Sequence, residues 1–550
     1  MSLRDDIVPL MRGDVSEDPQ DLEHFSRDTS IFKRRPSLVV SPKDPEDLSS
    51  LVRFVHEART RGENVSLTGR SAGTDMTGGP LTDSIVVSFT KYMNTMREIG
   101  SDYAVAEPGI YYRDFEKATR EKIGMILPSY PASREICALG GIVSNNSGGE
   151  LTLKYGKTDK YVRGLDVVLS DGSTATFGPL SPIELAAKES EQTFEGGIYR
   201  GMHALVRENA LVIEKARPKV SKNSSGYALW SVQDAEAGTF DLSKLIVGSQ
   251  GTLALVTSAK LSLVRRKQHR AMLVVFLKDL SILPEIVHRV LKHEPESFES
   301  YDNHTFELAI RFLPQILQHM GPLKALELGI SFVPEMFLVA TGGVPKLVLM
   351  AEFSEDSDEA ARDKAREARH ALADLPIRTR LALGKIGPEK YWKIRRESFN
   401  LLRKNVPGLY AAPFIDDFVV DPDTYPEFLP ELETLLASHP FTFTVAGHIG
   451  NGNFHIFPLV DMSKDQVHEE IIALNKQVYD LVLRYDGSIT GEHNDGIIRT
   501  PYVAQMFGPE MYVLFEKTKR IFDPLNIFNP GKKVGGTKED IAKYMMRTSK

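Results

Sequence analysis

Three stretches rich in glycine and other small residues punctuate the first half of the chain. They are GRSAGTDMTGG at 69–79, LGGIVSNNSGG at 139–149 and GSQGTL at 248–253. Small-residue loops that follow strands let backbone amides approach a phosphate group without hindrance from side chains. The first stretch matches neither the G-x-G-x-x-G dinucleotide fingerprint nor the lysine-containing P-loop. Together, the three loops favour an α/β chain that binds a phosphate-bearing group in another way.

Segments with strand and helix periodicity surround these loops. LVVSP at 38–42 predicts a strand, and the following PEDLSSLVRFVHEARTRG places Leu48, Leu51 and Val55 on one helical face. After Arg265 the strands AMLVVFL and KLVLMAEF alternate with amphipathic helices, which predicts a sheet covered by helices. We place a domain boundary at the basic run RRKQHR, 265–270, although such runs are also common on solvated surfaces.

Two histidines flank an Asn-Gly pair in AGHIGNGNFH, 446–455. Asn-Gly favours a two-residue hairpin turn, because both residues tolerate the positive φ of a type I′ turn. If Asn451 and Gly452 form that turn, His448 faces His455, with the two Cβ atoms about 5 Å apart. This spacing suits one metal ion, but it equally suits a hairpin whose histidines only hydrogen-bond. A third ligand would decide between these readings.

Composition excludes several classes of protein. The 550 residues carry a net charge of −7, so no basic field is available for nucleic acid. A single cysteine, Cys137, permits neither an intrachain disulfide nor a cysteine-ligated iron–sulfur cluster, and a reducing compartment is allowed. The acidic N-terminus fits no targeting peptide, and no long uncharged apolar run suits a transmembrane span. We expect a cytoplasmic protein in which the apolar segment 323–350 belongs to the core of a cap domain, with peripheral contact to the inner face of a membrane left open.

Several motifs occur in the order found in one protein family. GRSAGTDMTGG is followed by PASREICALGGIVSNNSGGELTLKYGKTDKYVRGLDVVLSDG, KNSSGYAL and GSQGTLALVT. SRDTSIFKRRPSLVVSPKDPEDL precedes them and FDPLNIFNPGKKV follows, so the likeness covers nearly the whole chain. On these motifs the chain resembles the FAD-linked oxidoreductases of the vanillyl-alcohol-oxidase type. The most similar branch contains D-lactate, glycolate and D-2-hydroxyglutarate dehydrogenases.

The resemblance implies an α+β fold. A two-part FAD-binding domain of the PCMH type is expected beside a cap domain made of an antiparallel sheet covered by helices. The expected boundaries are an N-terminal helical segment at 1–34, the FAD-binding domain at 35–265, the cap with the substrate and metal residues at 266–500, and a C-terminal helical segment at 501–550 that returns to the FAD-binding domain.

The resemblance also assigns cofactor-binding residues to the three loops. The first loop is implied to wrap the FAD pyrophosphate with its backbone amides, and Ser71 and Ala72 stand where the family has consecutive glycines. The second loop would pass along the flavin, the third would lie close by, and an asparagine of the tail would lie near the edge of the isoalloxazine ring. The implied residues are Arg70, Ser71, Ala72, Gly73, Thr74, Asp75, Gly140, Gly141, Asn145, Asn146, Gly148, Gly149, Gly251, Thr252 and Asn529.

The flavin is expected to be bound without a covalent link. Relatives with linked flavin usually use a histidine in the pyrophosphate loop, and residues 69–79 contain none. Cys137 lies where some doubly linked relatives carry a flavin-bonding cysteine, but branches with unlinked flavin also have cysteine there. We favour a packing role for Cys137.

A third metal ligand follows from GSITGEHNDGIIR at 487–499, which resembles the second active-site motif of the family. The resemblance implies that Glu492 joins His448 and His455 on a divalent metal and that His493 is the catalytic base. Two imidazoles and one carboxylate with open positions suit Zn, Mn or Fe(II), and we favour Zn.

YWKIRRESFNLL, beginning at Tyr391, resembles the Trp-x-x-Arg motif whose arginine grips the substrate carboxylate. The alignment selects Arg395, because a guanidinium pairs with a carboxylate through two hydrogen bonds. Arg396 could be a second anchor or a surface charge. Phe399 replaces a small polar residue of the hydroxyglutarate branch, which puts a second substrate carboxylate in doubt.

The function implied is oxidation of a D-2-hydroxy acid, similar to D-lactate, to its 2-oxo acid by hydride transfer to FAD. Neutral His493 would take the hydroxyl proton, so activity is expected to fall in acid. Other readings stay open: a sugar or alcohol oxidase, an enzyme similar to alkyldihydroxyacetonephosphate synthase, and a flavin subunit that passes electrons to an iron–sulfur partner. The expected external acceptor is a quinone, an electron-transfer flavoprotein or an iron–sulfur protein, and a homodimer is also left open.

Overall fold

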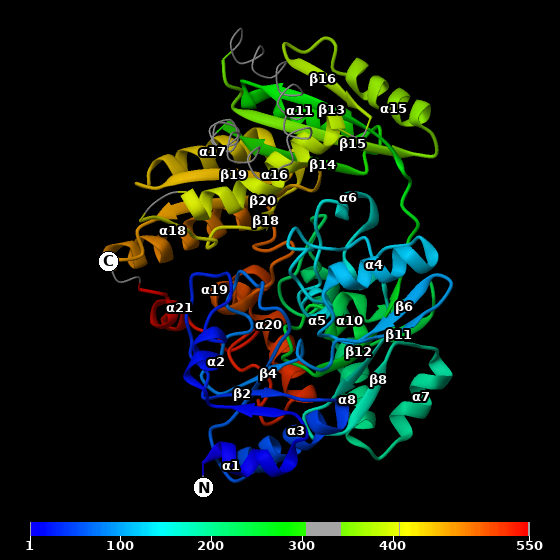
Figure 1. Ribbon diagram of the computed structural model, residues 1–550, viewed down its shortest axis with the longest axis vertical. Coiled ribbons are helices and arrows are strands. Elements are labelled where there is room, and N and C mark those ends of the chain that lie inside the picture. The colour runs from blue at the N-terminus through cyan, green and yellow to red at the C-terminus, as the bar shows by residue number, and fades with distance from the viewer. Residues whose placement is uncertain (1, 304–342, 385, 406–407, 548–550) are drawn as a thin grey trace.

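The computed structural model describes residues 2–303, 343–384, 386–405 and 408–547. An N-terminal part occupies the lower half of Figure 1 and a cap occupies the upper half. The N-terminal part begins with a four-stranded sheet of order β1-β2-β4-β3, in which β2, β4 and β3 run parallel. Its strands and helices are β1 (Asp14–Ser16), β2 (Leu38–Ser41), β3 (Leu67–Arg70), β4 (Ile85–Ser88), α1 (Leu3–Ile7), α2 (Pro19–His24) and α3 (Pro45–Thr60).

The helix predicted after the first strand is confirmed as α3. Asp44 caps it by accepting hydrogen bonds from the amides of Glu46 and Asp47, and Pro45 occupies its first turn. The predicted apolar face, including Leu48, Leu51 and Val55, is fully buried against the sheet. Local capping and helical periodicity therefore agree on this element.

A second, antiparallel sheet completes the N-terminal part, with the order β5-β6-β12-β7-β8. A small sheet of order β10-β11-β9 lies beside it. The bounds are β5 (Met96–Ile99), β6 (Tyr103–Ala106), β7 (Val162–Val168), β8 (Thr174–Phe177), β9 (Pro179–Leu180), β10 (Gln233–Asp234), β11 (Thr239–Asp241), β12 (Leu255–Ser262), α4 (Tyr112–Ile123), α5 (Leu139–Asn145), α6 (Thr152–Tyr155), α7 (Pro182–Ser190), α8 (Phe194–Glu208), α9 (Ala210–Ala216) and α10 (Ser243–Ile246).

The cap is built on one antiparallel sheet of order β16-β13-β15-β14-β19-β20-β17, with β18 also pairing with β20. Helix α15 packs on β13 and β15. The cap elements are β13 (His269–Leu277), β14 (Ser297–Asp302), β15 (Leu347–Glu355), β16 (Arg378–Leu383), β17 (Tyr410–Ala411), β18 (Phe418–Val419), β19 (Thr442–His448), β20 (Asn453–Val460), α11 (Leu283–Leu291), α15 (Asp358–His370), α16 (Ile386–Asn405), α17 (Tyr425–Ala437) and α18 (Asp465–Arg484).

The C-terminal segment runs back to the N-terminal part, as its orange and red colours in Figure 1 make visible. It contains α19 (Gly496–Arg499), α20 (Val503–Phe522) and α21 (Lys538–Tyr544). Helix α20 packs against α8 and α9, and Phe528 forms a parallel bridge with Leu67 of β3. The predicted α+β architecture, with an antiparallel cap sheet covered by helices, is confirmed.

A buried ionic cluster joins the N-terminal part to the cap. Arg266, between β12 and β13, contacts Glu296 and Glu352, which are 0% and 1% exposed, and its Nη2 lies 2.8 Å from Oε1 of Glu352. The hydroxyl of Tyr155 in α6 donates to Oε1 of Glu296 at 3.1 Å, and the indole of Trp392 in α16 donates to Oε2 of Glu352 at 2.8 Å. Burial raises the pKa of Glu296, but Arg266 outweighs burial, so this pKa lies below its ordinary value. The cluster therefore ties α6, the cap sheet and α16 together.

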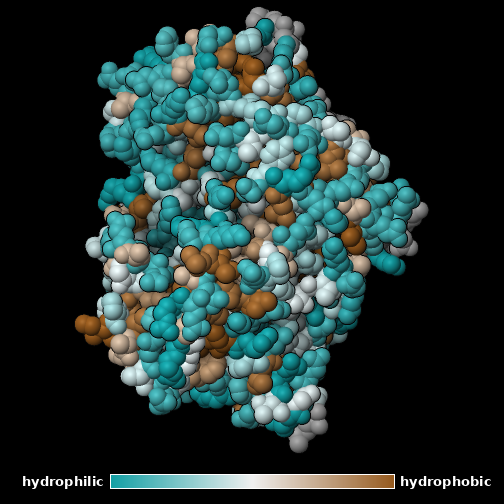
Figure 2. All heavy atoms as spheres, turned by 180° about the vertical axis from the view of Figure 1, so that it is seen from behind, coloured by the Kyte–Doolittle hydropathy of each residue, from teal (hydrophilic) through white to brown (hydrophobic). Residues whose placement is uncertain are grey.

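The apolar segment 323–350 is described only from residue 343 onward, so the prediction for its earlier residues lies outside the described residues. Among the helices in the described ranges, none combines the length and the apolar character needed to cross a membrane. On the rear face hydrophilic residues predominate, and hydrophobic ones form scattered patches (Figure 2).

Replacing Arg266 with alanine should destabilise the protein by about 3–5 kcal/mol, because two buried carboxylates would lose their nearest counter-charge. Lys267 is the matched control, because it is the next residue and pairs with Glu355 while its side chain is 35% exposed. Its alanine variant should lose no more than about 1 kcal/mol. Denaturant unfolding followed by fluorescence compares the two variants, and equal losses would contradict a special role for Arg266.

Candidate active site

The predicted histidine hairpin is formed by β19 and β20, but its turn differs from the prediction. Ile449–Asn451 form a short 3-10 turn, and Gly452 follows in the left-handed region at φ 71°. The register pairs His448 with Asn453 and Ala446 with His455, so the two histidines lie diagonally on one face instead of directly opposite. A Cβ on Gly452 would lie 1.7 Å from the carbonyl oxygen of Val420, so only glycine fits there. The prediction of a two-residue type I′ turn was wrong, because packing against β18 selects a longer turn.

The two imidazoles nevertheless meet the predicted carboxylate. The His448 and His455 rings lie 5.1 Å apart between centroids, and Nε2 of His448 lies 3.4 Å from Oε1 of Glu492. One ligand atom from each of these residues falls within 4.8 Å of the others. All three residues are buried, and Glu492 reaches the hairpin from the loop between α18 and α19. A buried set of two imidazoles and one carboxylate is the chemistry of a divalent metal site with open positions.

Each histidine of the pair is held by a carboxylate at its other nitrogen. Nδ1 of His448 lies 2.6 Å from Oε1 of Glu299, and Nδ1 of His455 lies 2.8 Å from Oδ1 of Asp416. An imidazole that donates from Nδ1 presents the lone pair of Nε2, which is the arrangement common behind metal ligands. The donor set therefore fits a divalent ion.

A lysine that sequence reasoning did not single out lies at the same carboxylate. Lys222 is 1% exposed, and its ammonium donates to Oε1 of Glu492 at 2.5 Å and to Oδ1 of Asn453 at 3.4 Å. Burial alone would raise the pKa of Glu492, but Lys222 and His448 hold it well below its ordinary value. Lys222 is the first residue of the KNSSGYAL motif, so the sequence contained a signal for this lysine. It did not indicate that Glu492 is the partner of Lys222.

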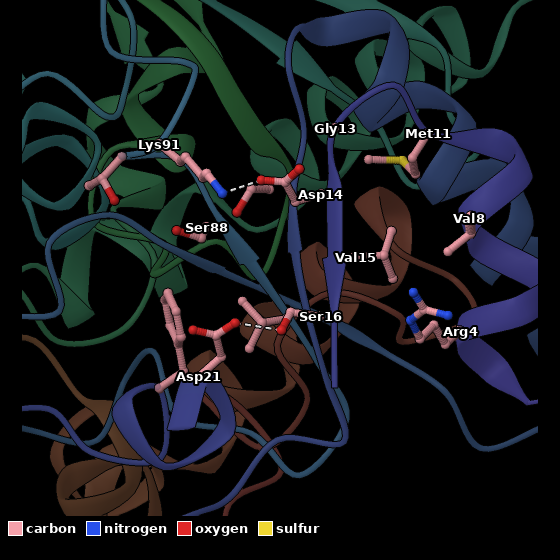
Figure 3. A pocket seen from close by; sticks show the side chains of 14 residues that line it. Arg4, Val8, Met11, Gly13, Asp14, Val15, Ser16, Asp21, Ser88 and Lys91 are labelled. Atoms are coloured by element: carbon pink, nitrogen blue, oxygen red, sulfur yellow. Dashed lines mark hydrogen bonds and ion pairs between the residues drawn. The ribbon is translucent and has the colours of Figure 1, made fainter. Parts of the chain in front are cut away.

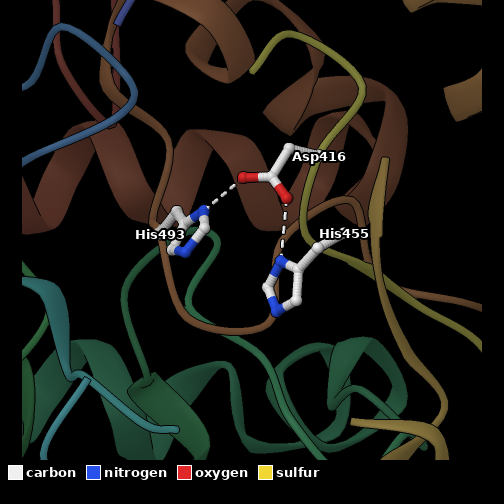
Figure 4. A group of neighbouring side chains, drawn as sticks. All are labelled: Asp416, His455 and His493. Atoms are coloured by element: carbon white, nitrogen blue, oxygen red, sulfur yellow. Dashed lines mark hydrogen bonds and ion pairs between the residues drawn. The ribbon is translucent and has the colours of Figure 1, made fainter. Parts of the chain in front are cut away.

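His493 follows Glu492 and faces Asp416. Nδ1 of His493 lies 2.6 Å from Oδ2 of Asp416, and the other oxygen of that carboxylate holds His455 (Figure 4). The side chain of His493 is 23% exposed, in contrast with the buried His448 and His455. Burial lowers the pKa of His493, but Asp416 and Asp417 outweigh it and raise this pKa to about 9. Asp417 also accepts hydrogen bonds from the amides of Glu492 and His493, which anchors the loop.

The predicted substrate arginine lies at the edge of this group. Arg395 is on α16, and its Nη2 lies 3.4 Å from Oε2 of Glu299. Its neighbour Arg396 forms two hydrogen bonds with Glu150, at 2.6 and 3.1 Å, directly after the loop that ends at Gly149. The guanidinium of Arg396 is therefore committed to an ion pair across the two parts of the molecule. The side chain of Phe399 lies outside the described residues.

The three small-residue loops converge, and part of the second loop is helical, as α5. Asn145 donates to Oδ1 of Asp75 at 2.9 Å, which joins the second loop to the first. Gln250 of the third loop donates to both, through Oδ1 of Asn145 and Oγ1 of Thr77, each at 3.4 Å. The side chain of Asn529 donates to the carbonyl oxygens of Gly79 and Gln250 at 3.0 and 2.8 Å. The residues predicted from distant motifs are thus brought together, and Gln250 is an addition.

Other predicted residues of these loops have side chains that form hydrogen bonds within the protein. Arg70 is buried and donates to the carbonyl oxygens of Phe25 and Arg27. Ser71 donates to Pro108, and Thr252 donates to Ser249. The remaining members lie in the same three loops: Ala72, Gly73 (φ 69°), Thr74, which accepts from Thr29, Gly140, Asn146, which accepts from the amide of Asp159, Gly149, and Gly251 (φ 66°).

Some glycines of the loops face space instead of protein atoms. A Cβ on Gly141 would meet no atom within 4 Å, and one on Gly251 would meet only Leu255, at 3.9 Å. A Cβ on Gly148 would lie 3.1 Å from Oε1 of Glu492, so the second loop directly approaches Glu492. The open faces beside Gly141 and Gly251 fit a bound flavin, because a side chain there would fill the cradle.

Cys137 is buried within the main apolar core of the N-terminal part. Burial raises the pKa of its thiol to about 12, so the reactive thiolate is disfavoured. This environment agrees with a packing role.

A separate polar cavity of about 640 Å³ lies between β1 and the ends of β2 and β4 (Figure 3). Lys91 contacts Asp14, and Ser16 donates to Asp21 at 2.5 Å, so these polar groups are already engaged with one another. His448, His455, Glu492 and His493 are not among the residues that line it.

The family models match two regions of the chain. Residues 36–178 match the FAD binding domain, and residues 266–533 match the C-terminal domain of FAD linked oxidases. D-2-hydroxyglutarate dehydrogenase of Escherichia coli (strain K12) is 28% identical over 532 residues, which cover 94% of this chain and 50% of that relative. The chain therefore spans about half the length of that relative.

D-lactate dehydrogenase of Archaeoglobus fulgidus is 25% identical over 521 residues, covering 94% of this chain and 96% of the relative. Among solved structures, 4-ethylphenol oxidase from Gulosibacter chungangensis superimposes with a TM-score of 0.68 at 16% identity, covering 96% of this chain and 95% of that one. That likeness concerns the fold. Both family models, these relatives and the shared fold show that the chain belongs to the FAD-linked oxidoreductases, with an FAD binding domain followed by the C-terminal domain of FAD linked oxidases.

Proposed function

We propose that this chain is an FAD-dependent dehydrogenase that oxidises a D-2-hydroxy acid, similar to D-lactate, to the 2-oxo acid with the help of a divalent metal. The observation that carries the proposal is the meeting of His448, His455 and Glu492 beside His493, against the glycine loop at Gly148. Relatives named D-lactate and D-2-hydroxyglutarate dehydrogenase support the same substrate class. Phe399, where the hydroxyglutarate branch has a small polar residue, favours an acid with one carboxylate.

FAD would be held by the three converging loops, without a covalent link. The open faces at Gly141 and Gly251 would lie against the cofactor, and Asp75, Asn145 and Gln250 would hold the loops together through their hydrogen bonds. When bound, FAD supplies the acceptor for a hydride from the substrate Cα. The buried thiol of Cys137 supports an unlinked flavin.

His448, His455 and Glu492 would hold the metal, for which we favour Zn over Mn or Fe(II). When bound, the ion polarises the substrate hydroxyl and lowers its pKa. Lys222 balances the charge of Glu492 inside the protein and keeps its carboxylate ionised, as a metal ligand requires.

The chain's own residues would orient the substrate and move its proton. Arg395 would hold the carboxylate through paired hydrogen bonds. Because Nδ1 of His493 faces Asp416, Nε2 is the atom that would accept the hydroxyl proton. His493 must be neutral to do so, and its raised pKa moves the loss of activity in acid to higher pH than for an ordinary histidine.

An acceptor outside these 550 residues would reoxidise the flavin, because a single cysteine cannot ligate an iron–sulfur cluster. A quinone, an electron-transfer flavoprotein or an iron–sulfur protein would serve.

An anaerobic screen of hydroxy acids tests the proposed reaction. D-lactate should bleach the flavin absorption band, whereas L-lactate should not, because the base and the hydride acceptor lie on fixed sides of Cα. D-2-hydroxyglutarate and glycolate are included to define the acid side chain. Bleaching by a neutral sugar or aromatic alcohol, but by no hydroxy acid, would contradict the proposal.

Replacing Gly141 with leucine should remove FAD while leaving the fold intact, because a Cβ at this position has open space within 4 Å and the rest of the side chain would extend into the proposed cradle. Gly197 in α8 is the matched control, since a Cβ there meets only Arg200, at 3.9 Å. Flavin absorbance of the purified variants and their circular dichroism give the comparison. Full FAD content in the Gly141→Leu variant would place the cofactor elsewhere.

Replacing His448 with alanine should abolish stoichiometric metal binding and lower turnover with an artificial dye by at least about 100-fold, because one of three ligands is lost. FAD content should be unchanged. His439, a half-buried histidine paired with Gln477 away from the proposed metal site, is the control, and its alanine variant should behave like the wild type. Metal analysis and dye reduction measure both effects; normal values for both in His448→Ala would end the metal hypothesis.

A further inference from the structure

Two buried carboxylates connect the metal-ligand histidines to the proposed substrate-handling residues. Glu299 is 2% exposed, and its Oε1 lies 2.6 Å from Nδ1 of His448 while its Oε2 lies 3.4 Å from Nη2 of Arg395. Asp416 is fully buried, and its Oδ1 lies 2.8 Å from Nδ1 of His455. The second oxygen of Glu299 thus faces Arg395, and the second oxygen of Asp416 faces His493.

The arrangement around Asp416 is visible in Figure 4, where its two oxygens point to His455 and His493. The distances are 2.8 Å to Nδ1 of His455 and 2.6 Å to Nδ1 of His493. The two rings also stack, with 5.3 Å between centroids and 27° between planes. One carboxylate therefore sets the orientation of both imidazoles.

We propose that Glu299 and Asp416 are positioning residues that couple the metal to the substrate-handling pair. Glu299 ties His448 to Arg395, and Asp416 ties His455 to His493. The inference rests on the proposed function, because it concerns the metal and the acid of that site. It assigns two residues that none of the sequence motifs singled out.

The sheet makes both carboxylates rigid supports of the hairpin. Glu299 lies on β14, which pairs with β19 beside His448. Asp416 precedes β18, which pairs with β20 through Phe418 and Phe454, next to His455. Ligands held from neighbouring strands move little, so a shift at either imidazole would be transmitted to Arg395 or His493.

Burial makes the two-partner arrangement costly to break. An ionised carboxylate away from water is tolerated only with paired charges or hydrogen bonds. Asparagine and glutamine keep one side-chain oxygen and replace the other with an NH₂ group, which donates hydrogen bonds. Only one of the two partners can then donate to the remaining oxygen. The other partner must turn away or change tautomer. A metal-supporting role alone would require only one of the two oxygens.

The variants Asp416→Asn and Glu299→Gln separate coupling from metal support. In both, affinity for Zn²⁺, measured by competition with a chromophoric chelator, should fall about 10- to 100-fold. At saturating Zn²⁺ a second defect should remain. Asp416→Asn should lower the maximal rate of anaerobic flavin reduction by D-lactate at least about 100-fold with little change in half-saturation, because the base is misplaced. Glu299→Gln should mainly raise the half-saturating concentration of D-lactate, at least about tenfold, because Arg395, which is proposed to hold the substrate carboxylate, is misplaced.

Glu296→Gln is the matched control, because Glu296 is a buried carboxylate directly before β14, the strand that carries Glu299. Its partners Arg266, Tyr155 and Ser354 lie outside the proposed metal site. It should keep wild-type Zn²⁺ affinity. Full rescue of either variant by saturating Zn²⁺ would overturn the coupling, as would wild-type kinetics and Zn²⁺ affinity in a folded variant. Each variant tests its own carboxylate, so one suffices where the other fails to fold. If the wild-type chain binds no divalent ion, or if D-lactate does not reduce its flavin, the proposed function itself is contradicted. That result is distinct from a failure of the coupling.

Discussion

Burial of the carboxylate of Glu492 is the constraint on which the centre of this molecule depends. The group is removed from water, so it must have partners, and it finds Lys222 from one motif and His448 from another. These partners come from the N-terminal part and from the cap. Lys222 and His448 must both reach this carboxylate, so the loop that carries Glu492 fixes the N-terminal part and the cap relative to each other.

Backbone contacts fix that loop on each side. On the cap side Asp417 accepts the amides of Glu492 and His493. On the other side Asn494 donates to the carbonyl oxygen of Gly248, and the amide of Gly496 donates to Gln250, at 2.8 Å in each case. The third small-residue loop is thereby tied to the loop that carries Glu492. Farther out, Arg396 with Glu150 holds the cap against the end of the second loop, and Tyr155 with Glu296 holds it against α6.

Much of the fold could be predicted from the sequence, because hydrophobic periodicity and helix-capping residues act locally. Helix α3 and the helix-covered sheet of the cap are examples, and the hairpin was predicted from Asn451-Gly452. The antiparallel order of the cap sheet was implied by the resemblance instead. The register of the hairpin was not predicted, because it depends on the contact of Gly452 with Val420, which directly follows β18 and lies far from the hairpin in sequence. The two histidines still meet, since diagonal neighbours share a face as opposite ones do.

The supporting residues of the site could not be predicted for a similar reason. Lys222, Glu299 and Asp416 are ordinary charged residues in sequence, and only the fold decides what each one faces. Gln250 lies inside a loop that was recognised, yet its amide was not assigned. Motifs therefore identified the groups proposed to touch metal and substrate, whereas the residues that orient them depend on tertiary contacts between strands and loops far apart in the chain.

The charges around the group also bear on what it can accept. The buried carboxylates are Glu299, Asp416, Asp417, Glu492 and Asp495, and the cationic groups that meet them or the loop are Lys157, Lys222, Arg395, Arg499, Lys533 and, when protonated, His493. These charges nearly cancel. A divalent cation held by His448, His455 and Glu492 would leave a positive excess in a site with little water to screen it. An anionic substrate removes that excess and a neutral alcohol does not, so the charge balance of these residues favours a hydroxy acid over a sugar or an aromatic alcohol.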